Sequence, residues 1–328
     1  MISIFKKNDV LNIALLLPYA ILIRLRSFIH PESYVLKDED SILAVWFFTL
    51  LPQPFVQSVI ATLLVFGQAI TINVLINNHR LYRSPNALTG MIYVLLASAI
   101  PQLQYLSPAL IGATFIIIAA FQVFNTYKVH AATLYIFNAA LASCVAAFVY
   151  PPYAFVIVGI FIGLATLRNF SLVERAQFLI GYVGIVWILS ALYFYVDKLD
   201  FTALSFSNFP GIIEEIEYNL SHNNIAVLTY LLLVVIVLLN YYGYMKKKGI
   251  DVRKKITFFY WLMVCSFLSL FFYLNIDIQH IIFLVIPLAF FISMSLFMVR
   301  QVFIIEVVHL SIVAGLLYYQ FIGYGLGA

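Results

Sequence analysis

Charged residues are scarce in this sequence. Of its 328 residues, 18 are Lys or Arg and 14 are Asp or Glu, so 10% are charged while 64% are hydrophobic. A soluble domain needs far more charge to cover its surface, which excludes that class and indicates a polytopic membrane protein. The net charge of +4 lies in short loops between apolar runs, so it gives no indication of nucleic-acid binding.

Several common motifs are also missing. The only cysteines, Cys144 and Cys265, lie inside apolar runs, which is typical of small buried residues rather than of a disulfide. No P-loop, Rossmann fingerprint or CxxC pattern is present. The alternation of polar and apolar residues that a membrane β-barrel requires is absent too. Long apolar runs such as "IAVLTYLLLVVIVLLNYYGY" therefore predict helices.

Apolar runs separated by charges or prolines predict an all-α bundle. A transmembrane helix needs about 20 apolar residues. We expect one transmembrane domain over residues 1–328, with eleven spans. They are 9–28, 55–77, 86–102, 107–125, 129–149, 152–167, 175–195, 224–245, 256–275, 281–299 and 302–322.

The distribution of charge predicts the orientation of these spans. If the N-terminus lies in the cytoplasm, most basic residues fall in inner loops and most acids fall outside, as the positive-inside rule requires. The C-terminus then lies outside, and two longer outer loops cover residues 29–54 and 196–223. In the first of them, the stretch 42–51 is too short to cross a bilayer and ends at prolines, which predicts an interfacial helix.

An acidic cluster, "KDED", directly precedes this interfacial helix. Carboxylates such as Asp38, Glu39 and Asp40 at a membrane face can act as a general base or hold a divalent cation. Arg24 and Arg26 come just before this loop, and guanidinium groups bind phosphate by paired hydrogen bonds. The alternative is that the arginines extend to lipid head groups and the acids are solvated. The sequence leaves both interpretations open.

Three further ionisable residues lie in or beside late spans. His280, in "LNIDIQHIIFLVIPLAF", occupies an outer turn, where it can donate a proton, bind phosphate or simply make an interfacial hydrogen bond. Glu306 and His309 are three residues apart in the last apolar run and share one helix face. We interpret them as an intramembrane polar pair, with a proton relay as the alternative. A single Glu-x-x-His does not predict a metal site.

Two long stretches carry a resemblance to a known family. They are "NNHRLYRSPNALTGMIYVLLASAIPQLQYLSPALIGATF" and "YIFNAALASCVAAFVYPPYAFVIVGIFIGLATLRNFSLVERAQFLIGYVGIVW". Together they resemble an uncharacterised family of polytopic inner-membrane proteins of Bacteroidota, and the resemblance covers most of the chain. It implies a multi-pass protein of the bacterial inner membrane. Some members carry the label beta-carotene monooxygenase-like, but the set of His residues that would hold iron is absent here.

At a looser level the order of elements is similar to that of the GT-C glycosyltransferase superfamily. Those helical bundles take sugars from polyprenyl-phosphate carriers. They place an acid in the first outer loop before an interfacial helix, as the "KDED" cluster does here, and a basic or His position before a late helix, as in "QHIIFLVIPLAF". The similarity implies a periplasmic active site in which one acid is the base or metal ligand. The groups that would hold phosphate are Arg24, Arg26 and His280.

A non-catalytic function stays open beside this one. The outer turn "PQLQYLSP" lacks the second acid that GT-C enzymes often carry. If the protein is not an enzyme, it would be a membrane transporter, or an integral-membrane subunit of an envelope assembly with protein partners. In that case the Glu306 and His309 pair would matter more than the outer acids. In either case membrane lipids surround the protein.

Overall fold

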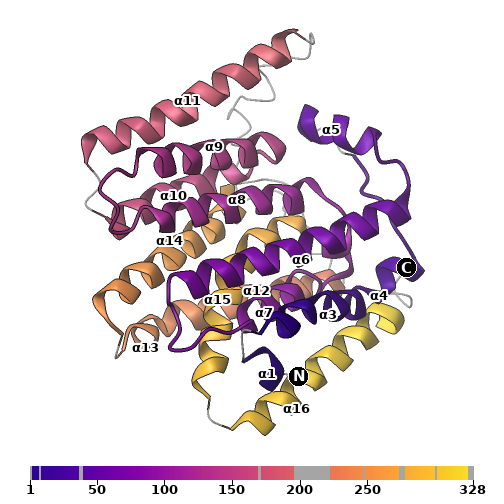
Figure 1. Cartoon of the computed structure of the whole chain (residues 1–328). Coiled ribbons are helices and arrows are strands. Elements are labelled where there is room, and N and C mark those ends of the chain that lie inside the picture. Colours follow the sequence, from indigo (N-terminus) through magenta and orange to yellow (C-terminus); the bar gives the residue numbers. More distant parts are fainter. Residues whose placement is uncertain are drawn as a thin grey trace.

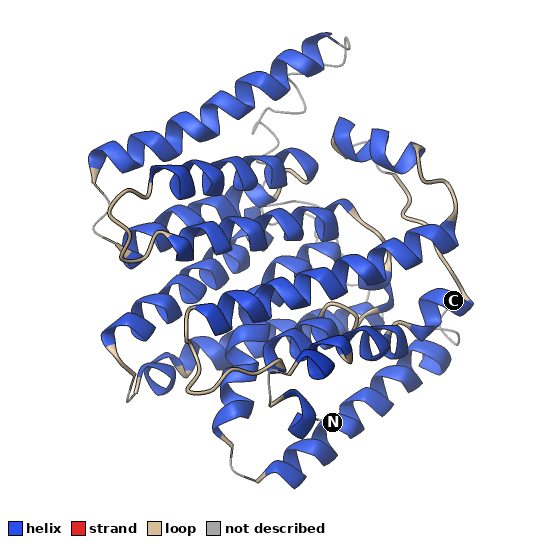
Figure 2. Cartoon of the chain, viewed as in Figure 1, coloured by secondary structure: helices blue, strands red, loops and turns tan. Residues whose placement is uncertain are grey.

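The fold is all-helical, as predicted. The computed structural model describes residues 2–6, 9–36, 40–168, 171–195, 222–246, 248–272, 278–299 and 301–323. Within these ranges every regular element is a helix and no strand occurs (Figure 2). Asp38, Glu39, Asp277 and most of the predicted loop 196–223 lie outside the described residues.

The helices follow one another along the whole described chain (Figure 1). The α-helices are α1 Ile2–Phe5, α2 Val10–Ala14, α3 Leu16–Ile23, α4 Leu25–Ile29, α5 Ile42–Thr49, α6 Pro54–Asn78, α7 Leu88–Leu96, α8 Pro108–Asn125, α9 Thr133–Val149, α10 Tyr153–Leu167, α11 Leu172–Tyr195, α12 His222–Leu239, α13 Tyr241–Met245, α14 Ile250–Phe272, α15 Ile282–Met298 and α16 Val302–Tyr318. Shorter 3-10 or π turns are η1 Pro101–Gln104, η2 Ile278–Ile281 and η3 Tyr319–Gly323.

Among the described residues, five helices are long and apolar enough to cross a membrane. They are Pro54–Asn78, Pro108–Asn125, Leu172–Ala191, Ile278–Met298 and Phe303–Phe321. This finding supports a membrane protein with several spans. Each of the eleven predicted ranges contains described helix, whereas the count of eleven spans and the orientation stay predictions.

Two predicted spans are interrupted for a local reason. The range 9–28 is divided into α2, α3 and α4, and the first break follows Ala14. Pro18 lacks the N–H that would bond to the carbonyl of Ala14, which explains this break. The range 86–102 holds only α7 before the chain turns into η1 at Pro101.

The predicted stretch 42–51 is the short helix α5, capped by Ser41, whose hydroxyl accepts the N–H of Ala44 at 3.2 Å.

The bundle has a central helix and two peripheral ones. Helix α15 packs against α7, α8, α12 and α14. Helix α11 packs on α9 at one edge, and α16 packs on α1 and α3 at the opposite edge (Figure 1). Close helix approach depends on small residues: a Cβ at Gly163 of α10 would lie 2.3 Å from the ring of Phe258 in α14.

One end of the bundle brings together Arg24, Arg26 and His280 of the predicted site. Helix α4 contacts η1, and η1 contacts η2. We call this region, formed by α4, η1 and η2, the α4 end. The loop that leads to α5 starts there, because it follows α4 directly.

Candidate functional site

Arg24 joins α4 to η1 and is completely buried, with 0% of its surface exposed. Its Nη1 donates to Ser98 Oγ at 3.3 Å, and its Nη2 donates to the carbonyl oxygen of Gln104. Its Nε has no hydrogen-bond partner among the residues that the structure describes. A phosphate could reach Arg24 only by breaking these bonds, so the contacts indicate that Arg24 positions η1.

Arg26 lies at the surface of the same end. Its Nη2 is 3.2 Å from Glu32 Oε1, and the hydroxyl of Tyr105 donates to the other oxygen of Glu32. The Arg26 side chain is 13% exposed and that of Glu32 is 40% exposed, so water reaches the pair. Because a guanidinium has five N–H donors, Arg26 can bind an anion while it retains Glu32.

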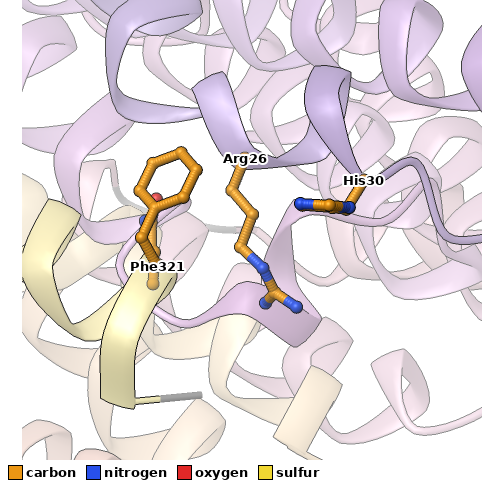
Figure 3. Close-up of a pocket in the computed structure, with 4 residues that line it drawn as sticks. Arg26, His30 and Phe321 are labelled. Atoms are coloured by element: carbon orange, nitrogen blue, oxygen red, sulfur yellow. The ribbon is translucent and has the colours of Figure 1, made fainter. Parts of the chain in front are cut away.

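Arg26 also lines a cavity of about 220 Å³, together with His30, Gln320 and Phe321. Figure 3 shows Arg26 between the ring of Phe321, which comes from η3, and the imidazole of His30, which follows α4. We call this cavity the Arg26–His30 pocket. Two basic side chains and an aromatic ring at a helix end are suited to a phosphate group with an apolar attachment.

Gln320 provides the polar floor of the pocket. Its side chain is 1% exposed, and its Nε2 donates to the carbonyl oxygen of Ser98 at 3.1 Å. Its Oε1 is buried with no hydrogen-bond partner in the described part of the chain. A buried acceptor without a partner is costly, so this oxygen is a place where a hydroxyl or N–H donor of a ligand would be stabilised.

Asp40 is the member of the acidic cluster that the structure describes. Its Oδ1 accepts the hydroxyl of Tyr34 at 2.9 Å, and Tyr34 itself is buried. The next residue, Ser41, donates its hydroxyl to the carbonyl oxygen of Val149 at 2.9 Å. The loop that holds Asp40 is therefore fixed to the end of α9, and the carboxylate is oriented by Tyr34.

His280 lies close to the same end of α9. Its Nδ1 is 3.2 Å from the hydroxyl of Tyr150, the residue after Val149. Its ring packs against those of Tyr150 and Phe283, with centroids 5.4 and 5.7 Å away, and it is buried. The structure thus connects His280 to the Asp40 loop through α9, and to Arg24 through η2 and η1. His280 can meet a phosphate only after this aromatic packing opens.

Glu306 and His309 lie away from the α4 end, on α16. The backbone N–H of Ser3 donates to Glu306 Oε1 at 3.2 Å, and His309 Nε2 is 3.3 Å from the hydroxyl of Tyr19. Both contacts tie α16 to the N-terminal segment. A mutual bond between Glu306 and His309 stays a prediction, whereas a structural role for each is supported by these contacts.

A second polar cluster, away from the α4 end, joins the loops that follow α6 and α8 to the start of α14. Lys128 and Tyr127 bond to Asp251 at 2.8 and 2.5 Å and hold the pKa of this exposed carboxylate below its ordinary value. Lys255 Nζ donates to the backbone oxygen of His79 at 2.9 Å. Burial and the charge of Lys255 lower the pKa of His79 to about 4. Only the basic character of these loops was visible in the sequence.

The sequence analysis also missed His30 and Gln320. His30 follows α4 without a recognisable motif, and Gln320 lies in an apolar run far along the chain. Within the described ranges, no group of three or more His, Cys, Asp or Glu could hold a metal ion. The predicted cation site of the acidic cluster stays a prediction, because Asp38 and Glu39 lie outside those ranges.

The chain was compared with known proteins at three levels. No protein-family model, no curated protein and no solved structure matches it.

Proposed function

We propose that the protein is a GT-C-like membrane glycosyltransferase that takes a sugar from a polyprenyl-phosphate-linked donor at the α4 end. The observation that supports it most is the Arg26–His30 pocket, which combines two basic side chains with the unpartnered Oε1 of buried Gln320. Arg26 and His30 would bind the donor phosphate. The oxygen of Gln320 would accept a hydroxyl of the donor.

Catalysis in this proposal needs a general base near the phosphate. The acceptor hydroxyl oxygen attacks the anomeric carbon, while a carboxylate of the acidic cluster takes the hydroxyl proton. The bond from the anomeric carbon to the phosphate oxygen breaks, and its electron pair leaves with the lipid phosphate. Arg26 then stabilises the negative charge on that leaving group.

The candidates for the base are Asp38, Glu39 and Asp40. Asp40 has the support of its bond from Tyr34, which orients its carboxylate at the start of the α5 loop. Arg24 and His280 take positioning roles, since both are buried beneath this end and bonded to neighbouring residues. The α4 end would face the periplasm, as the charge distribution predicts.

The acidic cluster can be tested by single amide substitutions. Asp38→Asn, Glu39→Gln and Asp40→Asn are each measured for transfer from a polyprenyl-phosphate sugar in membranes with equal protein levels. One of them should lose about a hundredfold or more in rate, because adjacent side chains point in different directions and only one can act as base. Asp9→Asn, at an exposed position before α2 where the side chain makes no cap hydrogen bond, is the matched control.

The opposite outcome is equally informative. Three amide variants near the wild-type rate would exclude the enzyme and leave solvated carboxylates, since exposed charges contribute little. The chain would then be a transporter or an envelope subunit.

A further inference from the structure

A long apolar groove lies between α16 and the helices α7, α12 and α15. It has a volume of about 820 Å³, and α7, α12, α15 and α16 all contribute to its walls. Typical lining residues are Leu96, Leu233, Leu296 and Leu316. The volume lies in the range of sites that hold a whole small ligand, about 300–1,000 Å³.

Two polar side chains in the wall have their polar groups engaged with the protein. The hydroxyl of Tyr230 donates to the carbonyl oxygen of Leu96 at 2.5 Å, and His309 is bonded to Tyr19. Most of the other lining residues are aliphatic, so the wall offers water few hydrogen-bond partners. The groove therefore suits an apolar occupant.

The groove is long and narrow. Its lining follows α16 from Ile304 to Tyr319, which is about 22 Å at 1.5 Å per residue. This is most of the roughly 30 Å thickness of the hydrocarbon core. An extended hydrocarbon chain can lie along such a groove and bring its head group to the basic side chains beside the end of the groove.

One end of the groove meets the Arg26–His30 pocket. Tyr319 lines the groove, while the next two residues, Gln320 and Phe321, line the pocket. Across from them, Ala99 and Ile100 line the groove, and the preceding Ser98 accepts the bond from Gln320. The end of the apolar groove therefore lies beside the basic pocket.

We propose that this groove binds one apolar chain of a membrane lipid, whose phosphate-bearing head group lies in the Arg26–His30 pocket. Arg26 and His30 complement the charge of the phosphate, and the groove replaces bilayer contacts of the chain. The inference that the phosphate binds in the pocket rests on the proposed function, because it uses the same pocket. The inference that the hydrocarbon chain of the lipid binds in the groove depends on the groove alone.

Two glycines allow a matched test of the chain site. Gly315 lines the groove, and a Cβ built there has no atom within 4 Å. Gly315→Leu therefore fills the groove without a clash. Gly184 of α11 has equally open space but lies outside the groove lining, so Gly184→Leu is the control. Both substitutions replace glycine by a better helix former.

The experiment uses the full-length protein in nanodiscs with two photoactivatable probes. One is a phosphatidic acid with the reactive group in its chain, and the other is the corresponding diacylglycerol, which lacks phosphate. Both should label α16 and α7 in the wild type. Gly315→Leu should reduce labelling by about tenfold or more, because overfilling a packed site is costly, whereas Gly184→Leu should not.

Arg26→Gln separates the two halves of the inference. It should weaken labelling by phosphatidic acid and leave labelling by diacylglycerol unchanged. Equal labelling of Arg26→Gln by both probes would overturn the head-group half, and the phosphate pocket of the proposed function with it. The acidic-cluster amides, by contrast, should change transfer without changing labelling.

Two results would overturn the proposal that the groove binds a hydrocarbon chain of a lipid. One is undiminished labelling of Gly315→Leu at α16 and α7. The other is a photoreactive residue at position 315 that cross-links to another protein, rather than to lipid, in native membranes.

Discussion

Helices α15 and α16 follow each other in sequence, and both are long and apolar enough to cross a membrane. In the stretch that contains α15, 72% of the residues are buried inside the protein, against 22% in the stretch that contains α16. Apolar character therefore does not decide which helix is central, because lipid tails satisfy an apolar side chain as well as the protein does.

Polar contacts distinguish the two helices better. Ser293 of α15 is 2.6 Å from the hydroxyl of Tyr82 and 2.8 Å from that of Thr89, in a buried network that joins α15 to α7. Helix α16 makes its polar contacts with the N-terminal segment, through Glu306 and His309. Apart from His309, the residues that α16 contributes to the groove between Ile304 and Leu316 are aliphatic or glycine. A helix held along one side only is suited to line a lipid site.

The largest expected effect comes from removing a matched ring in each helix. Phe290 of α15 is buried and stacks on Phe259 at 4.2 Å between centroids, whereas Phe303 of α16 is 78% exposed. Phe290→Ala should lower the free energy of unfolding by about 3 kcal/mol, since it leaves a cavity. Phe303→Ala should change it by less than about 0.5 kcal/mol.

Equilibrium unfolding in mixed detergent micelles measures both values. Equal losses for the two variants would contradict the division into a central and a peripheral helix. A large loss for Phe303→Ala alone would indicate that α16 belongs to a core that forms with a further chain.

A smaller effect tests the attachment of α16 to the N-terminal segment. Tyr19→Phe removes the hydroxyl that bonds to buried His309 and leaves the ring packing in place. It should cost about 1–2 kcal/mol, because a buried polar group loses its partner. Tyr318→Phe, at an exposed position of α16, is the control.

Hydrogen exchange along α16 is the decisive readout for Tyr19→Phe. Faster exchange in α1 and α16, with α15 unchanged, is the expected pattern. Faster exchange spread evenly over all helices would mean that the contact stabilises the whole bundle rather than one edge.

Much of the fold followed from local sequence patterns, and the exceptions have physical reasons. The predicted range 55–77 corresponds to α6, Pro54–Asn78, because Pro54 is suited to a first turn and charged residues follow the end. The range 9–28 is divided because Pro18 acts at one position within an otherwise apolar run. Composition predicts where helix is stable, and single residues decide where it breaks.

The candidate site at the α4 end was less predictable, because its side chains contact residues that are far away in the sequence. Arg24 lies 74 and 80 residues from Ser98 and Gln104, which occupy its donors. The sequence placed Arg24 and Arg26 in one role, whereas burial separates them into a positioning residue and a pocket residue. Gln320 joins the pocket only through the fold, so no local motif could have indicated it.

The last expected effect concerns polar contacts that titrate, away from the α4 end. Burial and Lys255 lower the pKa of His79 from its ordinary 6.5 to about 4 in the folded protein. Between these values the unfolded chain binds the proton more readily, so stability should fall as pH decreases from 6.5 to 4. The contribution of Asp251, whose pKa is lowered from 3.8, is lost only at lower pH.

The free energy of unfolding is measured at a series of pH values from 7 to 4.5. His79→Gln should flatten the slope of this free energy against pH, and the exposed His130→Gln should leave the slope unchanged. A slope that survives in His79→Gln would assign the pH dependence to another group and make Lys255 a purely structural contact of the His79 backbone.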